Sequence, residues 1–205
     1  MPNVPIASLT VLVSVFAVHS QHAHSQSTAP QIASESHAEV TLFDFSKLES
    51  MAGWIVVNDN VMGGRSIGGF ELDSGLLVFS GSTNTDGGGF SSIRGRLPEG
   101  ADWAEADGLL LRVRTSGKRS FKLDIRQTEG RSLAYRAPLQ IAEGDGWQDV
   151  KVPFRAFSAT WRGRAIRGSS FNPAAANQLG FFIYDGQDGP FHLEVARVTT
   201  YSETD

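Results

Sequence analysis

Short runs of apolar or alternating residues, each bounded by turn residues, recur along this chain from Val40 onward. In one of them Phe121, Leu123 and Ile125 alternate with polar residues, so that one face is apolar and the other polar. Roughly nine to eleven runs are strand candidates, and none has the length and period of an ordinary helix. The pattern predicts an all-β fold, specifically a jelly-roll-like antiparallel β-sandwich.

The strand candidates are separated by recognisable turn signals. Ser74-Gly75 is expected to close a hairpin, and Ser116-Gly117-Lys118 is expected to form a turn between two strands. Two segments with some helical character, 103–106 and 173–177, are too short for an ordinary helix and are predicted to be turns or single helical turns. The strand candidates are 40–45, 70–73, 76–79, 90–94, 109–113, 121–126, 147–154, 179–184 and 191–198.

The first 25 residues differ from the rest of the chain. An apolar run covers 6–18, too short to span a bilayer comfortably, and the small residues Ala23 and Ser25 precede a possible cleavage site. We therefore predict a signal peptide over 1–25, a flexible linker over 26–39 and a single β-sandwich domain over 40–202. This organisation predicts a periplasmic or secreted protein with no transmembrane segment in its mature chain.

Composition excludes several classes of function. The chain has 18 Lys and Arg against 22 Asp and Glu, a formal net charge of −4, which argues against a nucleic-acid binder. It contains no cysteine, so disulfides and cysteine-ligated metal centres are excluded. Beyond residue 25 the only histidines are His37 and His192, which lack the spacing of a zinc site. No metal or other cofactor is expected.

Glycine is concentrated in two segments, 54–70 and 87–94, and predicts two loops of tight backbone geometry. The residues 64–68 match the G-x-S-x-G pattern of hydrolases, but no helix follows, so a glycine-rich turn is favoured over a nucleophilic Ser66. Asn58-Asp59-Asn60 offers oxygens suited to calcium, although a structural turn stabilised by these side chains is the favoured interpretation.

Arginines gather around Trp161 at 155, 162, 164 and 167, in a segment predicted to be a long loop. Such a loop suits an acidic partner or an anionic ligand, and a solvated loop is the equally weighted alternative. Asp185 lies in a turn and offers a carboxylate without an identifiable catalytic partner. The four tryptophans suit either a sugar-stacking platform or, more often in a sandwich, the core.

Taken in order, these motifs resemble the complex I intermediate-associated protein 30 family. The resemblance covers nearly the whole of the predicted domain. It rests on Trp54 with 58–66, then 79–81, 87–94, Gly108-Leu109, Trp147, 152–154 with Phe157, 162–164, Gly180-Phe181 and 189–191. The resemblance implies a galactose-binding-like jelly roll and a non-enzymatic protein, associated in its mitochondrial members with assembly of respiratory complex I. It implies no catalytic residue.

We therefore expect a binding or assembly-factor-like domain whose partner is a protein, possibly a respiratory-chain subunit. An exported carbohydrate-binding module is the alternative, and a hydrolase using an acid such as Asp59 or Asp185 is the least favoured. The predicted binding surface comprises Asn58, Asp59, Asn60, Met62, Arg65, Ser66, Phe90, Arg94, Arg162, Arg164 and Asp185.

Overall fold

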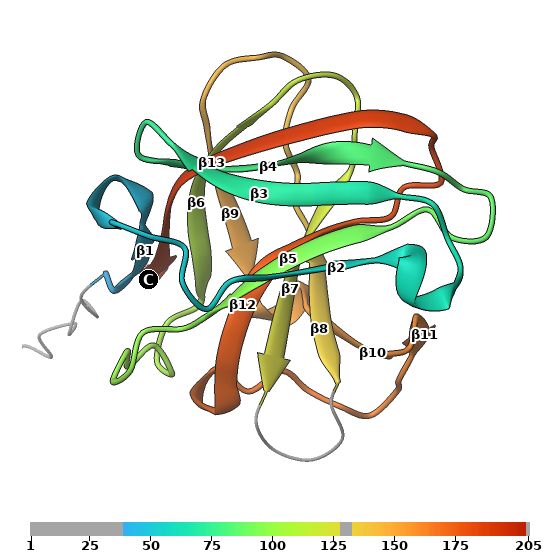
Figure 1. Ribbon diagram of the computed structural model, residues 1–205. Coiled ribbons are helices and arrows are strands. Elements are labelled where there is room, and N and C mark those ends of the chain that lie inside the picture. Colours follow the sequence, from blue (N-terminus) through green and yellow to red (C-terminus); the bar gives the residue numbers. More distant parts are fainter. Residues whose placement is uncertain (1–38, 128–132, 204–205) are drawn as a thin grey trace, which may run out of the picture. The chain divides into compact units, whose positions relative to one another are not determined.

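The computed structural model describes residues 39–127 and 133–203, which form thirteen strands and four short 3-10 helices (Figure 1). The predicted signal peptide and all but the last residue of the predicted linker lie outside the described residues. The 3-10 helices are η1 (Phe45–Lys47), η2 (Asp59–Met62), η3 (Phe154–Ala156) and η4 (Pro173–Ala175). The segment 173–177 therefore contains a single helical turn, as predicted.

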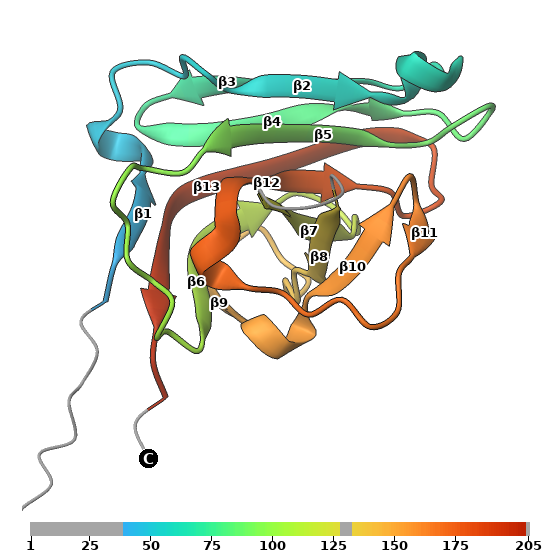
Figure 2. The same cartoon turned by 90° about the horizontal axis from the view of Figure 1, so that it is seen from below.

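The strands form two antiparallel sheets. Sheet A contains β1 (Thr41–Asp44), β3 (Ile67–Asp73), β4 (Leu76–Thr83), β6 (Gly108–Thr115), β9 (Gln148–Pro153) and β13 (Gly189–Tyr201). Its order is β3-β4-β13-β6-β9, with β1 beside the second half of β13. The long strand β13 therefore holds sheet A together, and Figure 2 shows it running along this sheet.

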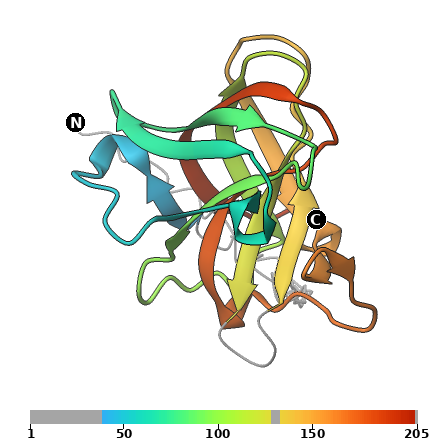
Figure 3. The same ribbon diagram turned by 45° about the vertical axis from the view of Figure 1, so that its right-hand side comes forward.

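Sheet B contains β2 (Ile55–Asn58), β5 (Ser91–Arg96), β7 (Phe121–Gln127), β8 (Ala134–Pro138), β10 (Ser158–Trp161), β11 (Arg164–Ala165) and β12 (Ala176–Ile183). Its order is β11-β10-β8-β7-β12-β5-β2. Figures 1 and 3 show β12, β7 and β8 side by side in this sheet.

Alternate residues of both sheets meet in one apolar core. On β7 the alternation is complete, because Phe121, Leu123 and Ile125 are buried in the core cluster while the intervening residues point to the opposite face. Sheet A contributes Leu109, Leu111 and Val113 of β6 to the same core. Burying a large apolar side chain stabilises a fold by about 2 kcal/mol, so this alternation accounts for the packing of the two sheets. The predicted antiparallel β-sandwich is confirmed.

The two predicted turns, at 74–75 and 116–118, connect their strands in different ways. Asp73 pairs with Leu76, so Ser74-Gly75 closes the predicted β3–β4 hairpin. The segment 116–118 also turns, but it carries the chain from β6 in sheet A to β7 in sheet B. Sequence periodicity cannot distinguish a hairpin from such a crossing, because both strands have one apolar face in either case.

The prediction of a long loop around Trp161 is wrong. This segment contains β10 and β11, which form a tight hairpin in which Trp161 pairs with Arg164. Arg162 and Gly163 occupy the two turn positions with φ values of +46° and +79°. Positive φ at both positions identifies a type I′ turn, whose twist suits a two-residue hairpin loop. The usual sequence signal for this turn is Asn-Gly or Asp-Gly, and the arginine at the first position replaces it.

Candidate functional site

The two glycine-rich loops meet at the carboxylate of Asp59. Its Oδ1 accepts a hydrogen bond from the Ser66 backbone N–H at 2.8 Å, and its Oδ2 accepts one from the Ser66 hydroxyl at 2.5 Å. Oδ2 also accepts the backbone N–H groups of Gly89 at 2.6 Å and Phe90 at 3.3 Å. Asp59 is 0% exposed, so this side chain joins the loops from beneath. We call this contact the loop junction.

Two glycines explain why the backbone can approach Asp59 so closely. A Cβ added at Gly64 would lie 2.3 Å from the Asp59 Cγ, and one added at Gly88 would lie 2.3 Å from its Oδ2. Both distances are far inside van der Waals contact, so any larger residue would displace the carboxylate. Gly64 in the first segment and Gly88 in the second are therefore packing requirements of the loop junction.

The donors around Asp59 favour its ionised form. Burial alone would raise the pKa of this carboxyl, but the hydrogen bonds from Gly89, Ser66 and Phe90 outweigh burial and hold its pKa below the usual value. Since these oxygens already accept four hydrogen bonds from the protein, they are poor candidates for calcium ligands. Among the described residues, no group of three or more His, Cys, Asp or Glu side chains is placed to hold a metal ion.

Asn58 adds a second link beside the loop junction. Its Nδ2 donates to the Gly68 carbonyl at 3.1 Å, and its Oδ1 accepts the Ser91 hydroxyl at 2.6 Å. A side chain on β2 thus contacts both β3 of sheet A and β5 of sheet B. The Asn58-Asp59-Asn60 motif is used structurally at its first two positions, but through bonds to residues 7 to 33 positions away and not through the local turn that the sequence favoured.

Ser66 is buried in the same way. Its hydroxyl donates to Asp59 and accepts the Asn84 backbone N–H at 3.0 Å. The residue after Gly68 continues strand β3, so the strand-to-helix turn of a nucleophile elbow is not formed at this motif. The structure agrees with a glycine-rich connection at 64–66, which leads into β3 at Ile67.

Exposed apolar side chains surround the loop junction. Val61, Met62 and Ile67 are 69%, 68% and 74% exposed, on η2 and at the start of β3. Arg65 lies among them and pairs with Asp86 of the second loop at 3.1 Å, with both side chains exposed. The junction therefore presents large apolar groups on a backbone that is held by buried hydrogen bonds.

The outer face of sheet B, turned away from the core, carries a cluster of charged residues on neighbouring strands. Asp124 of β7 is fully buried and pairs with Arg136 of β8 at 3.0 Å, with Arg126 at 3.3 Å and with Arg94 of β5 at 3.9 Å. Arg94 reaches it across Gly180 of β12, which is the Cα partner of both residues. We call these four charged residues the arginine cluster.

The electrostatics of the arginine cluster are unbalanced. Burial and the nearby charges of Arg126 and Arg136 lower the pKa of Arg94, while Asp124 acts in the opposite direction. In addition, the Nε of Arg126 is buried and has no hydrogen-bond partner among the described residues. The three guanidinium groups therefore have more hydrogen-bonding and charge capacity than Asp124 uses.

Aromatic rings lie between the loop junction and the arginine cluster. Phe90, whose N–H contacts Asp59, stacks on Phe182 with ring centroids 5.6 Å apart. The guanidinium carbon of Arg136 lies 3.7 Å from the Phe182 ring centroid, and the ring centroid of the exposed Tyr184 lies 6.4 Å from it. Phe90 thus connects the two candidate sites.

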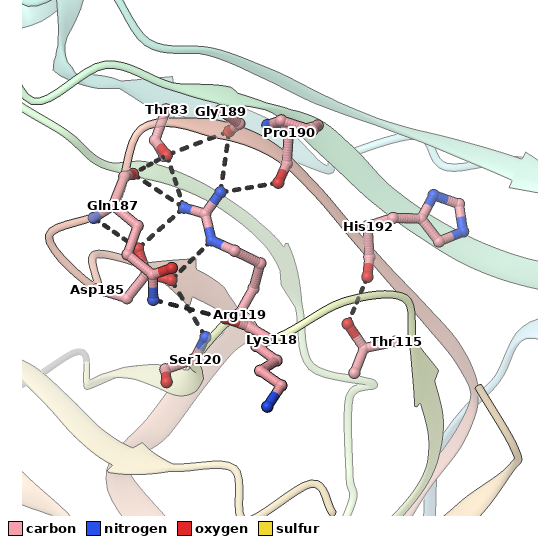
Figure 4. Close-up of polar contacts among 10 residues, drawn as sticks. All are labelled: Thr83, Thr115, Lys118, Arg119, Ser120, Asp185, Gln187, Gly189, Pro190 and His192. Atoms are coloured by element: carbon pink, nitrogen blue, oxygen red, sulfur yellow. Dashed lines mark hydrogen bonds and ion pairs between the residues drawn. The ribbon is translucent and has the colours of Figure 1, made fainter. Parts of the chain in front are cut away.

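Asp185 was predicted to be part of the binding surface, but its carboxylate is buried in an ion pair. Its side chain is 3% exposed and forms a bidentate pair with Arg119, at 2.8 and 2.9 Å (Figure 4). Arg119 also donates to the Thr83 hydroxyl and to the carbonyls of Gly189 and Pro190. Burial would raise the pKa of Asp185, but hydrogen bonds from Arg119 and the backbone hold it below the usual value.

The structure brings together only part of the predicted binding surface. The loop junction contains or borders the predicted residues from Asn58 to Ser66 together with Phe90, and Arg94 lies on the adjoining strand. Arg162 and Arg164 are exposed at the other edge of sheet B, on the β10–β11 hairpin. The sequence did not single out Asp124, Arg126, Arg136, Phe182 or Tyr184 as site residues. The alternation on β7 shows that Asp124 and Arg126 share a face, but the sequence does not show which strands lie beside β7.

The four tryptophans do not gather on one surface. Trp54 packs against Phe43 and Phe45, and Trp103 is 4% exposed in the core. Trp147 lies beneath the guanidinium groups of Arg112 and Arg114 on sheet A, and Trp161 is on the β10–β11 hairpin. The core interpretation is confirmed for the first two, and the dispersal removes the sequence argument for a shared sugar platform.

Comparison with known proteins identifies the family. The sequence profile of Complex I intermediate-associated protein 30 matches residues 43–195, which include the loop junction and the arginine cluster. This chain belongs to the complex I intermediate-associated protein 30 family. The mitochondrial protein of this name from Mus musculus is 29% identical over 185 residues, 79% of this chain and 56% of the mouse protein.

Other members of the complex I intermediate-associated protein 30 family are also similar to this chain in sequence. The Drosophila melanogaster protein is 28% identical over 75% of this chain and 60% of its own length, and the probable Caenorhabditis elegans member is 31% identical over 64% and 44%. The chain thus spans about half the length of these relatives. They are named as mitochondrial proteins, a finding that contradicts the predicted periplasmic or secreted location; the apolar run behind that prediction lies outside the described residues.

Solved structures similar to this family member confirm the galactose-binding-like fold. The carbohydrate-binding module CtCBM11 has a TM-score of 0.60 at 17% identity, covering 85% of this chain and all of that module. A family 30 carbohydrate-binding module of a Clostridium thermocellum cellulase has a TM-score of 0.54 at 15% identity, with 82% and 100% coverage. At these identities the likeness concerns the fold alone. No helix in the described part of the chain is long and apolar enough to cross a membrane.

Proposed function

We propose that this chain is a non-enzymatic binding domain that contacts protein partners during assembly of NADH:ubiquinone oxidoreductase. The observation that carries the proposal is the loop junction, where exposed Val61, Met62 and Ile67 are presented by loops held at Asp59. Exposed apolar side chains on a rigid backbone are typical of protein interfaces. Membership of the complex I intermediate-associated protein 30 family supports the assembly role.

The predicted site residues divide into two roles within this proposal. Asn60, Met62 and Arg65 would contact the partner directly, because they are exposed at the junction. Asn58, Asp59 and Ser66 would position them from beneath through the buried hydrogen bonds. The remaining predicted residues are Phe90 and Arg94 beside the junction, Arg162 and Arg164 on the β10–β11 hairpin, and Asp185 in its pair with Arg119.

Affinity capture of the tagged full chain from its own cells tests this function. We expect subunits of NADH:ubiquinone oxidoreductase to co-purify, and Met62→Asp to reduce their recovery at least about tenfold, as for a central interface residue. Lys118→Asp is the matched control, because Lys118 is exposed in the β6–β7 connection, is not part of the junction and receives the same side chain. Equal recovery with both variants, or no such subunits with the unsubstituted chain, would refute the proposal.

Carbohydrate binding is the alternative function. The dispersed tryptophans give it no specific support in this structure, and the related modules share the fold at low identity only. Titration of the purified chain with a β-1,3-1,4-mixed-linked tetrasaccharide, the ligand in one of the similar structures, tests it directly. Saturable binding would favour the alternative.

A further inference from the structure

Charge is distributed unequally between the two sheets. In the seven described strands of sheet B, Asp124 is the only acidic residue, whereas the basic residues are Arg94, Arg96, Lys122, Arg126, Arg136 and Arg164. The described strands of sheet A mix both signs, with Asp44, Glu71, Asp73, Asp149 and Glu194 against Arg112, Arg114, Lys151 and Arg197. The net charge of −4 therefore conceals one basic face.

The basic residues of β5, β7 and β8 point to one side, whereas Arg164 of β11 lies on the other face, opposite Trp161. Lys122 and Arg126 alternate with the core residues of β7, and Arg94 flanks the buried Ile93 on β5. Cross-strand pairing places Arg136 directly opposite Asp124. These residues consequently share the outer face, where a ligand can reach them without disturbing the core.

Asp124 does not saturate the arginine cluster. One carboxylate faces three guanidinium groups, so the cluster carries excess positive charge at side chains only 17% to 21% exposed. A buried donor without an acceptor destabilises a fold, and within residues 39–127 and 133–203 the Nε of Arg126 is such a donor. An additional anion at this face would offset the excess positive charge and would give the buried N–H group a hydrogen-bond acceptor.

The surroundings of the cluster favour a peptide over a bare ion. Exposed Tyr184 and Ile55 border the face, and Phe90 joins it to the apolar loop junction. Guanidinium groups bind carboxylates with paired hydrogen bonds, and neighbouring apolar groups suit the rest of a polypeptide. We propose that the outer face of sheet B binds an acidic segment of a protein partner, its carboxylates received by Arg94, Arg126 and Arg136. This proposal rests on the proposed function and adds the chemistry of the partner.

A fluorescent peptide of ten glutamates, titrated into the full chain at low salt and followed by anisotropy, tests the proposal. A peptide of ten glutamines is the neutral control. We expect the glutamate peptide to bind, and Arg94→Gln to weaken it at least about tenfold, because hydrogen bonds between charged groups are lost. Arg112→Gln is the matched control, since Arg112 pairs with Asp149 on sheet A, and it should leave binding unchanged.

A second variant guards against misfolding of Arg94→Gln. Lys122 lies on the same face but outside the ion pairs of Asp124, so Lys122→Gln should keep the melting temperature and weaken the glutamate peptide about twofold to fivefold. Equal binding of the two peptides, or equal effects of Arg112→Gln and the sheet B variants, would overturn the proposal. Tighter arginine-dependent binding of inorganic phosphate or polygalacturonate would overturn its assignment to a protein. The peptide assay needs no assembly partner, so it can fail or succeed independently of the capture experiment.

Discussion

The carboxylate of Asp59 accepts hydrogen bonds from residues as far as 31 positions away along the chain. Replacing it with alanine would leave the N–H groups of Ser66 and Gly89 without acceptors in a buried site. We expect Asp59→Ala to lower the free energy of unfolding by about 3 kcal/mol or more. Urea denaturation at neutral pH measures this loss, and a change below about 1 kcal/mol would contradict the role given to Asp59.

The same residue has a predicted pH dependence. Its pKa is lower in the folded chain than in the unfolded chain, so its contribution is complete above the unfolded value and is lost as the pH falls through the folded value. We therefore expect the stability difference between the unsubstituted chain and Asp59→Asn to shrink when unfolding is measured below about pH 4. The comparison isolates Asp59 from other acids whose pKa is lowered, such as Asp185 and Glu194. A difference that is constant across this range would contradict the assignment.

Gly88 gives a steric test of the loop junction. Gly88→Ala places a methyl group against the Asp59 carboxylate, and we expect a loss of about 2 to 4 kcal/mol in unfolding free energy. Gly69→Ala is the matched control, because nothing lies within 4 Å of its added Cβ. A strand residue with free space should tolerate the methyl group or gain slightly from it. Similar losses in both variants would refute the steric explanation.

At the scale of elements, the Arg119–Asp185 pair joins two connections that pass between the sheets. Arg119 lies between β6 and β7, and Asp185 between β12 and β13 (Figure 4). We expect Asp185→Ala to cost about 3 to 5 kcal/mol, because it leaves Arg119 buried without its counter-ion. The double variant Arg119→Met/Asp185→Leu should recover part of this loss in thermal unfolding. A double variant no more stable than Asp185→Ala would argue against this account.

At the scale of the whole molecule, the described core belongs to the chain from Val40 onward. Val40 itself packs against the core and bonds Thr200 at 2.8 Å. We expect a chain that begins at His37 to unfold within about 2 °C of the full chain in calorimetry, since each kcal/mol corresponds to about 2–4 °C at this size. A decrease of more than about 5 °C would show that the preceding residues stabilise the domain.

The sequence by itself determined the class of fold. Alternation of apolar and polar residues on β6 and β7 depends only on the two-residue period of a strand, so it is legible without knowing which strands are neighbours. The order of glycine-rich and aromatic motifs likewise indicated the family, and both predictions are confirmed. The type I′ turn at Arg162-Gly163 was not predicted, because arginine rarely adopts a positive φ and therefore gives no turn signal in the sequence.

Only the tertiary structure decided how the motifs combine. Asp59 and Gly88 are distant in sequence, and nothing local indicates that one carboxylate fills the space that a glycine leaves. The arginine cluster depends on β5, β12, β7 and β8 lying in that order, so that Arg94, Asp124 and Arg136 fall on one row. Periodicity assigns each residue to a face of its own strand, but strand order and register are long-range contacts, and these determine which charges meet.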